Sequence, residues 1–193
     1  NGRIDMIIDS GKVDIGLEST IVDLSEGVPT ILRPGYITKE MLEEVLGKVE
    51  VDQAIIRDDS NIVPKAPGMK YKHYAPKADL TLVEPEGMAM DQDQVMRMVE
   101  TVRKLAEEKC SLGFRVGIIC TDESASEYPR GLVRSIGARR SQASVAHNLY
   151  AVLREFDDLK VEYIFSESFS EDHLGQAIMN RLSKAAGYKI VRV

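Results

Sequence analysis

The 193-residue sequence lacks several features that mark common protein classes. No apolar run approaches the roughly 18 residues that a membrane span needs, and no targeting pattern stands in the sequence as given. We therefore expect a cytoplasmic protein with no membrane partner. Neither GxGxxG nor GxxxxGKS/T occurs, so the phosphate-binding loops of dinucleotide and P-loop folds are excluded.

Cysteine and histidine are also scarce. Cys110 and Cys120 show no CxxC spacing, which predicts reduced thiols packed in the core of a protein from a reducing compartment. The histidines stand apart at positions 73, 147 and 173. Zinc sites need clustered ligands, so we expect no protein-held metal from this pattern.

Basic residues are in the minority, and the net charge is -6. This balance argues against broad binding to a nucleic-acid backbone, although a local patch could still contact RNA. The stretch "PRGLVRSIGARRS" carries arginines at 130, 134, 139 and 140. A solvated surface is the simpler interpretation of these arginines, and an RNA contact is the alternative.

The first third of the sequence is rich in short β-type runs. Strands are expected at 4–9, 19–24, 30–35 and 54–59. Between them, apolar residues at helical spacing predict a helix that Thr38 caps and Gly47 ends. The sequence begins with Asn1 and runs directly into "GRIDMIIDSG", which resembles the middle of a fold. We therefore expect a fragment of a longer protein.

From residue 79 onward, strands and helices alternate. Apolar periodicity predicts helices around 95–106, 145–156 and 174–185, with Gly187 ending the last one. Strands are expected at 79–85, 115–121, 132–138, 161–167 and 188–193. This alternation indicates an α/β, Rossmann-like three-layer domain with a mostly parallel sheet.

Residues 62–78 follow neither period, and they contain the acid-free stretch "APGMKYKHYAPKA". We place the domain boundary here, dividing the chain into 1–61, an extended linker at 62–78, and 79–193. The stretch has three interpretations: a plain linker, a nucleic-acid contact, or a lid over a bound nucleotide. In the second, Tyr71, His73 and Tyr74 would stack on bases between the lysines.

Polar side chains suited to binding lie in "GLESTIVDLSEGVPTILRPG", residues 16–35. Glu18, Ser19 and Thr20 come just before one expected strand, and Arg33 ends the next. If the strands are neighbours, hydroxyls and a guanidinium converge at one rim of the sheet. Such groups bind a small polar substrate and a phosphate or carboxylate. The alternative is a strand-entry turn with a solvated arginine.

Four motifs in order resemble one family. "GRIDMIIDSG", "GLESTIVDL", "ILRPGYIT" and "PGMKYKHYAP" are similar to the Sua5 branch of the Sua5/YciO/YrdC family, the threonylcarbamoyl-AMP synthases. The closing "HLGQAIMNRLSKAAG" resembles the last helix of the Sua5 C-terminal domain. The resemblance covers nearly the whole chain, and it makes residues 1–61 the tail of a YrdC-like α/β domain.

The resemblance implies that L-threonine, bicarbonate and ATP give threonylcarbamoyl-AMP and pyrophosphate, with Mg²⁺ as the metal. The product would serve threonylcarbamoylation of adenosine 37 in tRNA, linking the protein to the tRNA-modification machinery. The same likeness implies that Ser19 contacts L-threonine and that Arg33 contacts the nucleotide. Tyr71, His73 and Tyr74 are expected to reach the nucleotide from the linker as a lid.

The chain departs from the family in two places. The family's Asp-Gly-Gly is Asp9-Ser10-Gly11 here. The lysine-arginine pair and the later serine and asparagine that hold ATP in the family would precede Asn1, so no catalytic residue is assigned. We therefore expect a C-terminal fragment that is inactive alone, with residual strands poorly supported at their edges. The alternative is an RNA-binding or regulatory docking module without catalysis.

Overall fold

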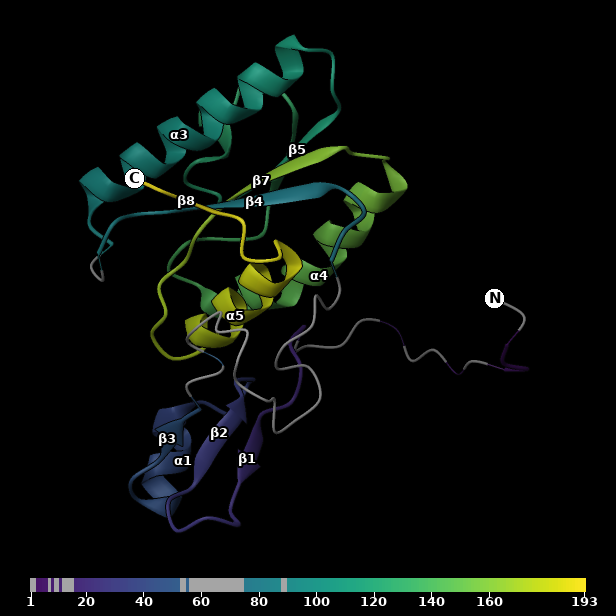
Figure 1. Ribbon diagram of the computed structural model, residues 1–193. Helices are drawn as coiled ribbons and strands as arrows, with labels where there is room; N and C mark the ends of the chain where they lie inside the picture. The colour runs from purple at the N-terminus through teal and green to yellow at the C-terminus, as the bar shows by residue number, and fades with distance from the viewer. Residues whose placement is uncertain are drawn as a thin grey trace.

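The computed structural model describes residues 3–6, 8, 11, 16–52, 55, 75–87 and 90–193. It contains two units, each built on its own sheet (Figure 1). The smaller unit has a three-stranded sheet in the order β1-β2-β3, formed by β1 (Ile21–Asp23), β2 (Thr30–Arg33) and β3 (Glu50–Val51). Strand β1 runs antiparallel to β2, and β3 runs parallel to it.

The helix of the smaller unit, α1 (Lys39–Leu46), begins and ends where the sequence predicts. The Thr38 hydroxyl accepts a hydrogen bond from the Met41 amide at 3.4 Å, which satisfies a free donor of the first turn. Gly47 follows the last turn with φ 76°, a conformation that glycine adopts without steric cost. The helix packs on a small core that includes Ile31 and Val49.

The larger unit has five strands, in the spatial order β6-β5-β7-β4-β8, and every pairing is parallel. The expected Rossmann-like sheet is thus confirmed. Its strands are β4 (Asp79–Glu84), β5 (Val116–Cys120), β6 (Leu132–Ser135), β7 (Tyr163–Glu167) and β8 (Ile190–Arg192). The helices are α3 (Gln92–Ser111), α4 (Gln142–Asp158) and α5 (Gly175–Ala185), with a short 3₁₀ helix, η1 (Ala125–Glu127).

The direction of each crossover sets the layers of the larger unit. Connections between parallel strands of one sheet are right-handed. The connection through α3 runs from β4 toward the β6 edge, whereas those through α4 and α5 run toward the β8 edge. Because the handedness is the same, opposite directions place the helices on opposite faces. Figure 1 shows α3 over one face and α4 and α5 over the other.

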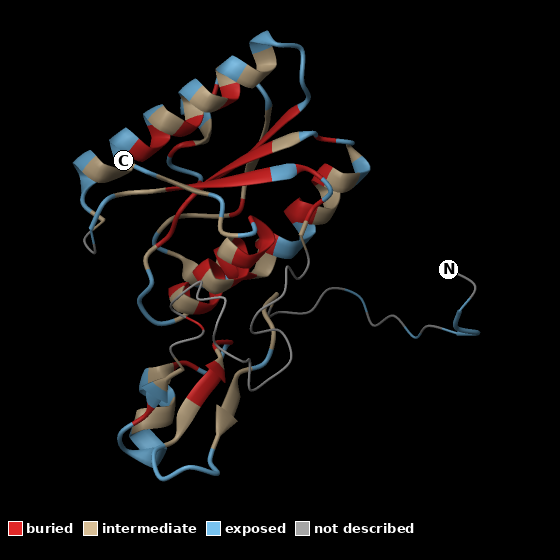
Figure 2. Ribbon diagram, in the orientation of Figure 1, coloured by how far each residue is buried: buried red, intermediate tan, exposed pale blue. Residues whose placement is uncertain are grey.

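Each face of the sheet packs on its own core, and alternate strand residues divide between the two. Leu80, Leu82 and Ile164 face the α4–α5 core, while Val83 and Phe165 face the α3 core. The burial pattern in Figure 2 shows both cores as buried segments along the strands and the inner sides of the helices. The smaller unit has far less buried surface.

One close approach requires glycine inside β5. A Cβ atom at Gly117 would lie 2.9 Å from the ring of Phe156 on α4, closer than real Cβ contacts. Phe156 is fully buried, so the missing side chain lets this ring pack directly on the strand.

The expected strand at 4–9 is wrong, and the one at 54–59 lies mostly outside the described residues. In 4–9, residues 4–6 and 8 are irregular, and Ile4 and Ile8 are 71% and 91% exposed, because the described chain offers these residues no strand partner. In 54–59, the described residue, Ile55, is helical. Strand β3 was not expected, since two residues give no readable period.

The division into 1–61, 62–78 and 79–193 stays a prediction, because residues 56–74 lie outside the described part. The end of the expected linker packs on the larger unit. The Lys77 amide donates to the Asp157 carboxylate at 2.7 Å, and Arg154 donates to the Ala75 carbonyl at 3.1 Å. Ala78 is buried in the α4–α5 core.

Candidate functional site

The loop of residues 16–20 lies between the two units. A Cβ atom at Gly16 would lie 2.4 Å from the carbonyl oxygen of Ala146 and 2.7 Å from that of His147, both on α4. Leu17 packs against the α4–α5 core. The loop is therefore fixed by the larger unit, although it leads directly into β1 of the smaller one.

Ser19 and Arg33 are brought together as the sequence predicts, because β1 and β2 are neighbours. The Arg33 guanidinium donates from Nε to the Ser19 carbonyl at 2.9 Å, and from Nη2 to the Ser19 hydroxyl at 3.0 Å. The Thr20 hydroxyl donates to the Ile37 carbonyl at 2.6 Å. Arg33 is partly buried, and these contacts hold its guanidinium against the loop.

Helix α5 of the larger unit adds two cations to this rim. Arg181 donates from Nη1 to the Glu18 carboxylate at 2.6 Å, and its side chain is only 7% exposed. The guanidinium carbon of Arg181 also lies 5.1 Å from the ring centroid of Tyr150 on α4, within cation–π range. One helical turn on, the Lys184 ammonium donates to the Asn180 side-chain oxygen at 2.8 Å.

Lys184 is buried, and charges of both signs lie near it. Its pKa is lowered to about 8, first by burial and also by the nearby Arg33, while the Glu18 carboxylate opposes the shift. A serine hydroxyl, a guanidinium and a buried lysine thus share one rim with a carboxylate. Chemically, such a rim suits a small polar molecule that carries an anionic group.

Three predicted site residues, Tyr71, His73 and Tyr74, lie outside the described residues. Their contact with a nucleotide stays a prediction. The residues that sequence reasoning missed are Arg181 and Lys184. An arginine and a lysine three apart in an amphipathic helix read as a solvated face, and no local signal connects them with a loop more than 160 residues earlier.

A buried polar network lies at the carboxyl edge of the larger sheet. Glu167, at the end of β7, is fully buried and accepts from the Ser124 hydroxyl at 2.5 Å and from the Tyr128 hydroxyl at 2.6 Å. Arg139 forms an ion pair with its other oxygen. Burial raises the pKa of the Glu167 carboxyl, while Arg139 and the two hydroxyls act in the opposite direction.

This network corrects the interpretation of the arginine-rich stretch as solvated surface. Arg139 is held by Glu167 and by the Ser168 carbonyl at 3.0 Å. Arg134 pairs with Glu155 on α4 at 2.6 Å. Two of the four arginines in this stretch therefore form ion pairs within the larger unit. This weakens the case for an RNA contact there.

A capping box lies at the start of α3. The Asp91 carboxylate accepts from the Gln94 amide at 2.8 Å, and the Gln94 side chain accepts from the Asp91 amide at 3.1 Å. This capping box occupies backbone donors that bind phosphate in dinucleotide folds.

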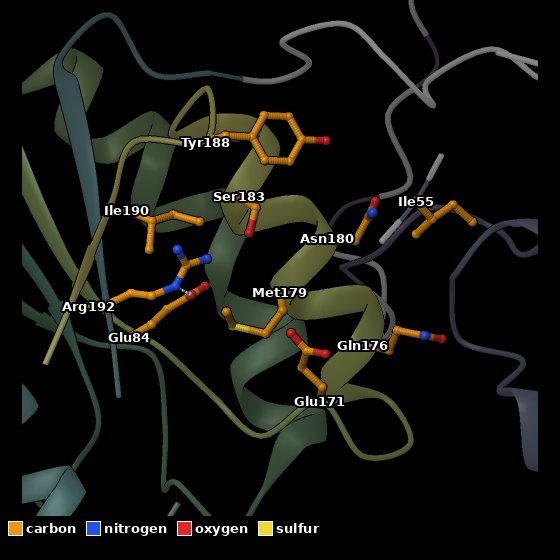
Figure 3. Close-up of a pocket in the computed structure, with 10 residues that line it drawn as sticks. All are labelled: Ile55, Glu84, Glu171, Gln176, Met179, Asn180, Ser183, Tyr188, Ile190 and Arg192. Atoms are coloured by element: carbon orange, nitrogen blue, oxygen red, sulfur yellow. Dashed lines mark ion pairs between the residues drawn. The ribbon is translucent and has the colours of Figure 1, made fainter. Parts of the chain in front are cut away.

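A cavity of about 370 Å³ runs along another side of α5 (Figure 3). Asn180 and Ser183 of α5, Ile55 of the smaller unit and the Glu84–Arg192 ion pair at 3.8 Å are among its lining. Burial raises the pKa of the Glu84 carboxyl. The cavity is lined by both signs of charge, so it points to no particular ligand.

The two cysteines are free, as the sequence predicts. Cys120 is buried in the α3 core, and burial raises the pKa of its thiol to about 12. The thiol therefore stays protonated and unreactive near neutral pH.

The expected Mg²⁺ stays a prediction. Among them, no group of three or more His, Cys, Asp or Glu side chains gathers closely enough to hold one. Protein-bound Mg²⁺ is typically held through one or two carboxylates together with substrate phosphates. Glu18, the carboxylate beside Ser19, is already paired with Arg181.

Comparison with known proteins gives the family. The sequence model described as "Threonylcarbamoyl-AMP synthase, C-terminal domain" matches residues 37–187. The chain belongs to the Sua5 family. Threonylcarbamoyl-AMP synthases from Bacillus subtilis and Pyrococcus abyssi are 42% and 39% identical to it, and both alignments cover 100% of the chain. The alignments cover 51% and 52% of those relatives, so the chain spans about half their length.

Two solved Sua5 structures from P. abyssi share the fold of the whole chain. One is a variant in which a histidine and the following tyrosine are alanine, with a TM-score of 0.84. The other is a complex with L-threonine, with a TM-score of 0.83. Both are 36% identical to this Sua5-family chain, cover 100% of it, and are themselves covered to 51% and 52%. Among its described helices, none is long and apolar enough to cross a membrane.

Proposed function

We propose that this chain is part of an L-threonylcarbamoyladenylate synthase, a nucleotidyltransferase that supplies tRNA threonylcarbamoylation at adenosine 37. The overall reaction converts L-threonine, bicarbonate and ATP into threonylcarbamoyl-AMP, pyrophosphate and water. The observation that carries the proposal is the pair of hydrogen bonds from Arg33 to Ser19. The family resemblance assigns these two residues to different substrates, and the hydrogen bonds that hold them side by side support the proposal.

The proposed reaction requires that the substrates be positioned and that the negative charge of the nucleotide be neutralised. The carbamate of L-threonine attacks the α-phosphorus of ATP, a new P–O bond forms, and the bond to pyrophosphate breaks. Ser19 binds L-threonine beside Arg33, whose guanidinium faces the negative charge of the nucleotide. The P. abyssi relative complexed with L-threonine supports this substrate.

In the proposed reaction, Tyr71, His73 and Tyr74 close over the nucleotide as a lid. Expelling water from a closed site strengthens every contact between charges inside it. His73-Tyr74 is the single His-Tyr pair in the sequence. The P. abyssi variant also has a histidine-tyrosine pair replaced by alanine. This supports a role for the His73-Tyr74 segment in the proposed reaction.

We further propose that the 193-residue chain is inactive alone, because the family's ATP-holding residues are not among its motifs. A docking role for the larger unit is supported by the contacts of α4 and α5 with the loop at 16–20. RNA binding is the weaker alternative.

The test is pyrophosphate release from ATP by the complete protein that contains this chain, beside the 193-residue chain. We expect release by the complete protein only, and only with both L-threonine and bicarbonate present. Ser19→Ala should raise the KM for L-threonine, whereas Ser25→Ala, an exposed serine on the β1–β2 turn, should not. Release without L-threonine, or by neither protein, would refute the proposal.

The lid has its own test in the complete protein. Tyr74→Ala should weaken the apparent affinity for ATP, because one wall of the closed nucleotide site is lost. An unchanged affinity for ATP would remove the lid from the mechanism while leaving the reaction itself in place.

A further inference from the structure

The loop that carries Ser19 takes its shape from contacts with the larger unit. Gly16 is pressed against the backbone of α4, and Leu17 is packed into the α4–α5 core. Glu18 follows, and its carboxylate meets Arg181 at 2.6 Å. Three consecutive residues ahead of Ser19 are thus anchored to a unit that contributes no substrate contact in the proposed reaction.

Arg181 is itself held rigidly. Its side chain is 7% exposed, and the ring of Tyr150 lies against its guanidinium. A guanidinium that is buried and stacked has few rotamers available, so it fixes the position of the carboxylate that it binds. Glu18 is 27% exposed, which leaves the ion pair only partly screened by water.

The anchored loop leads on to both predicted substrate contacts. Ser19 follows Glu18 directly, and its carbonyl and hydroxyl both accept from Arg33. Close packing fixes the loop from the other side, because a Cβ atom at Gly35 would lie 2.3 Å from the Glu18 carbonyl. A shift of Glu18 therefore moves Ser19, whereas Arg33 is held separately by its place at the end of β2.

We propose that Arg181 of α5 is a positioning residue for the L-threonine end of the site, acting through Glu18 on Ser19. The inference rests on the proposed function, and it gives the larger unit a role in that function. In this role the larger unit makes no substrate contact, and its α5 sets the geometry of a loop that leads into the other sheet.

The experiment uses the complete protein and measures steady-state pyrophosphate release with L-threonine and ATP varied in turn. In Arg181→Met, kcat/KM for L-threonine should fall by about 10- to 100-fold, as expected for a misplaced binding group. The KM for ATP should change much less, because Arg33 remains anchored on β2. Arg181→Lys keeps a charge near Glu18 and should recover part of the loss.

A double-mutant cycle isolates the ion pair. Glu18→Gln should resemble Arg181→Met, and the double variant should be no worse than either single one, because the same contact is lost. The matched control is Arg134→Met. Arg134 pairs with Glu155 at the same 2.6 Å, away from Ser19, and this variant should keep wild-type kinetics.

The outcomes separate this inference from the proposed function. An inactive wild-type protein refutes the function and this inference with it. An active wild type with unaltered L-threonine kinetics in Arg181→Met and Glu18→Gln overturns only the positioning role. If Arg181→Met fails to fold, Glu18→Gln and Arg181→Lys carry the test: a thermal midpoint near wild type with a raised KM for L-threonine supports positioning. Equal changes in the KM for both substrates overturn it.

Discussion

Replacing Lys184 by methionine should change how stability depends on pH. The ordinary pKa of a lysine, 10.5, is lowered to about 8 in the fold, chiefly by burial. Each pKa unit corresponds to about 1.4 kcal/mol, so holding this charge in the fold costs on the order of 3 kcal/mol. The cost is present in full below pH 8, where both the folded and unfolded chains are protonated.

Between pH 8 and 10.5 the unfolded chain keeps the Lys184 proton while the folded chain has lost it. The unfolded state then binds more protons, so the free energy of unfolding rises with pH across this window. Relative to Lys184→Met, the wild type should therefore gain about 2–3 kcal/mol between neutral pH and roughly pH 10.

Urea unfolding of the 193-residue chain, followed by circular dichroism at several pH values, measures this difference. Lys189→Met is the control, because Lys189 is 51% exposed and pairs with Asp79 at the surface. Its difference from the wild type should stay flat over the same pH range. If the free energy of unfolding depends on pH in the same way in the wild type and in Lys184→Met, the argument that Lys184 is a buried charged group beside the site is refuted.

Three further substitutions test the contacts that hold the fold. Glu167→Leu should lower the free energy of unfolding by about 3–5 kcal/mol, because it leaves the Arg139 charge unpaired beside the core. Adding Arg139→Met should recover part of this loss. No recovery would contradict the ion pair. Gly16→Ala should lower the thermal midpoint because its Cβ has no room, whereas Gly27→Ala, with nothing within 4 Å, should not; equal midpoints would contradict the close packing. Thr38→Ala should cost about 1 kcal/mol in urea unfolding through the lost cap, and no cost would contradict it.

Local pattern predicted most of the secondary structure. The helices α3, α4 and α5 were found because each buries one face, and the apolar period of 3.6 residues survives in the sequence. The run at 4–9 has the same composition as a strand, but a strand also needs a partner. Sequence composition alone does not show which strands pair. For the same reason, the order of the five parallel strands could not be predicted from the sequence.

The candidate site was predictable only where its residues lie close in the sequence. Ser19 lies just before β1, and Arg33, 14 residues later, ends β2, so their meeting followed from one assumption about strand pairing. Arg181 lies 163 residues from Glu18, and Arg139 lies 28 residues before Glu167. In both cases the arginine looked solvated because its partner comes from a distant element.

The position of β4 in the larger sheet sets an order of assembly. This strand, at residues 79–84, pairs with β7 at 163–167 and with β8 at 190–192. The chain leaves the ribosome from its N-terminal side, so β4 is synthesised before both of its partner strands. Contacts between residues that are far apart in the sequence slow folding. Glu18 is likewise synthesised well before Arg181, its ion-pair partner. The loop that carries Ser19 is thus synthesised well before α5 and is among the last parts to be fixed, and until then its apolar neighbours are exposed to chaperones and to aggregation.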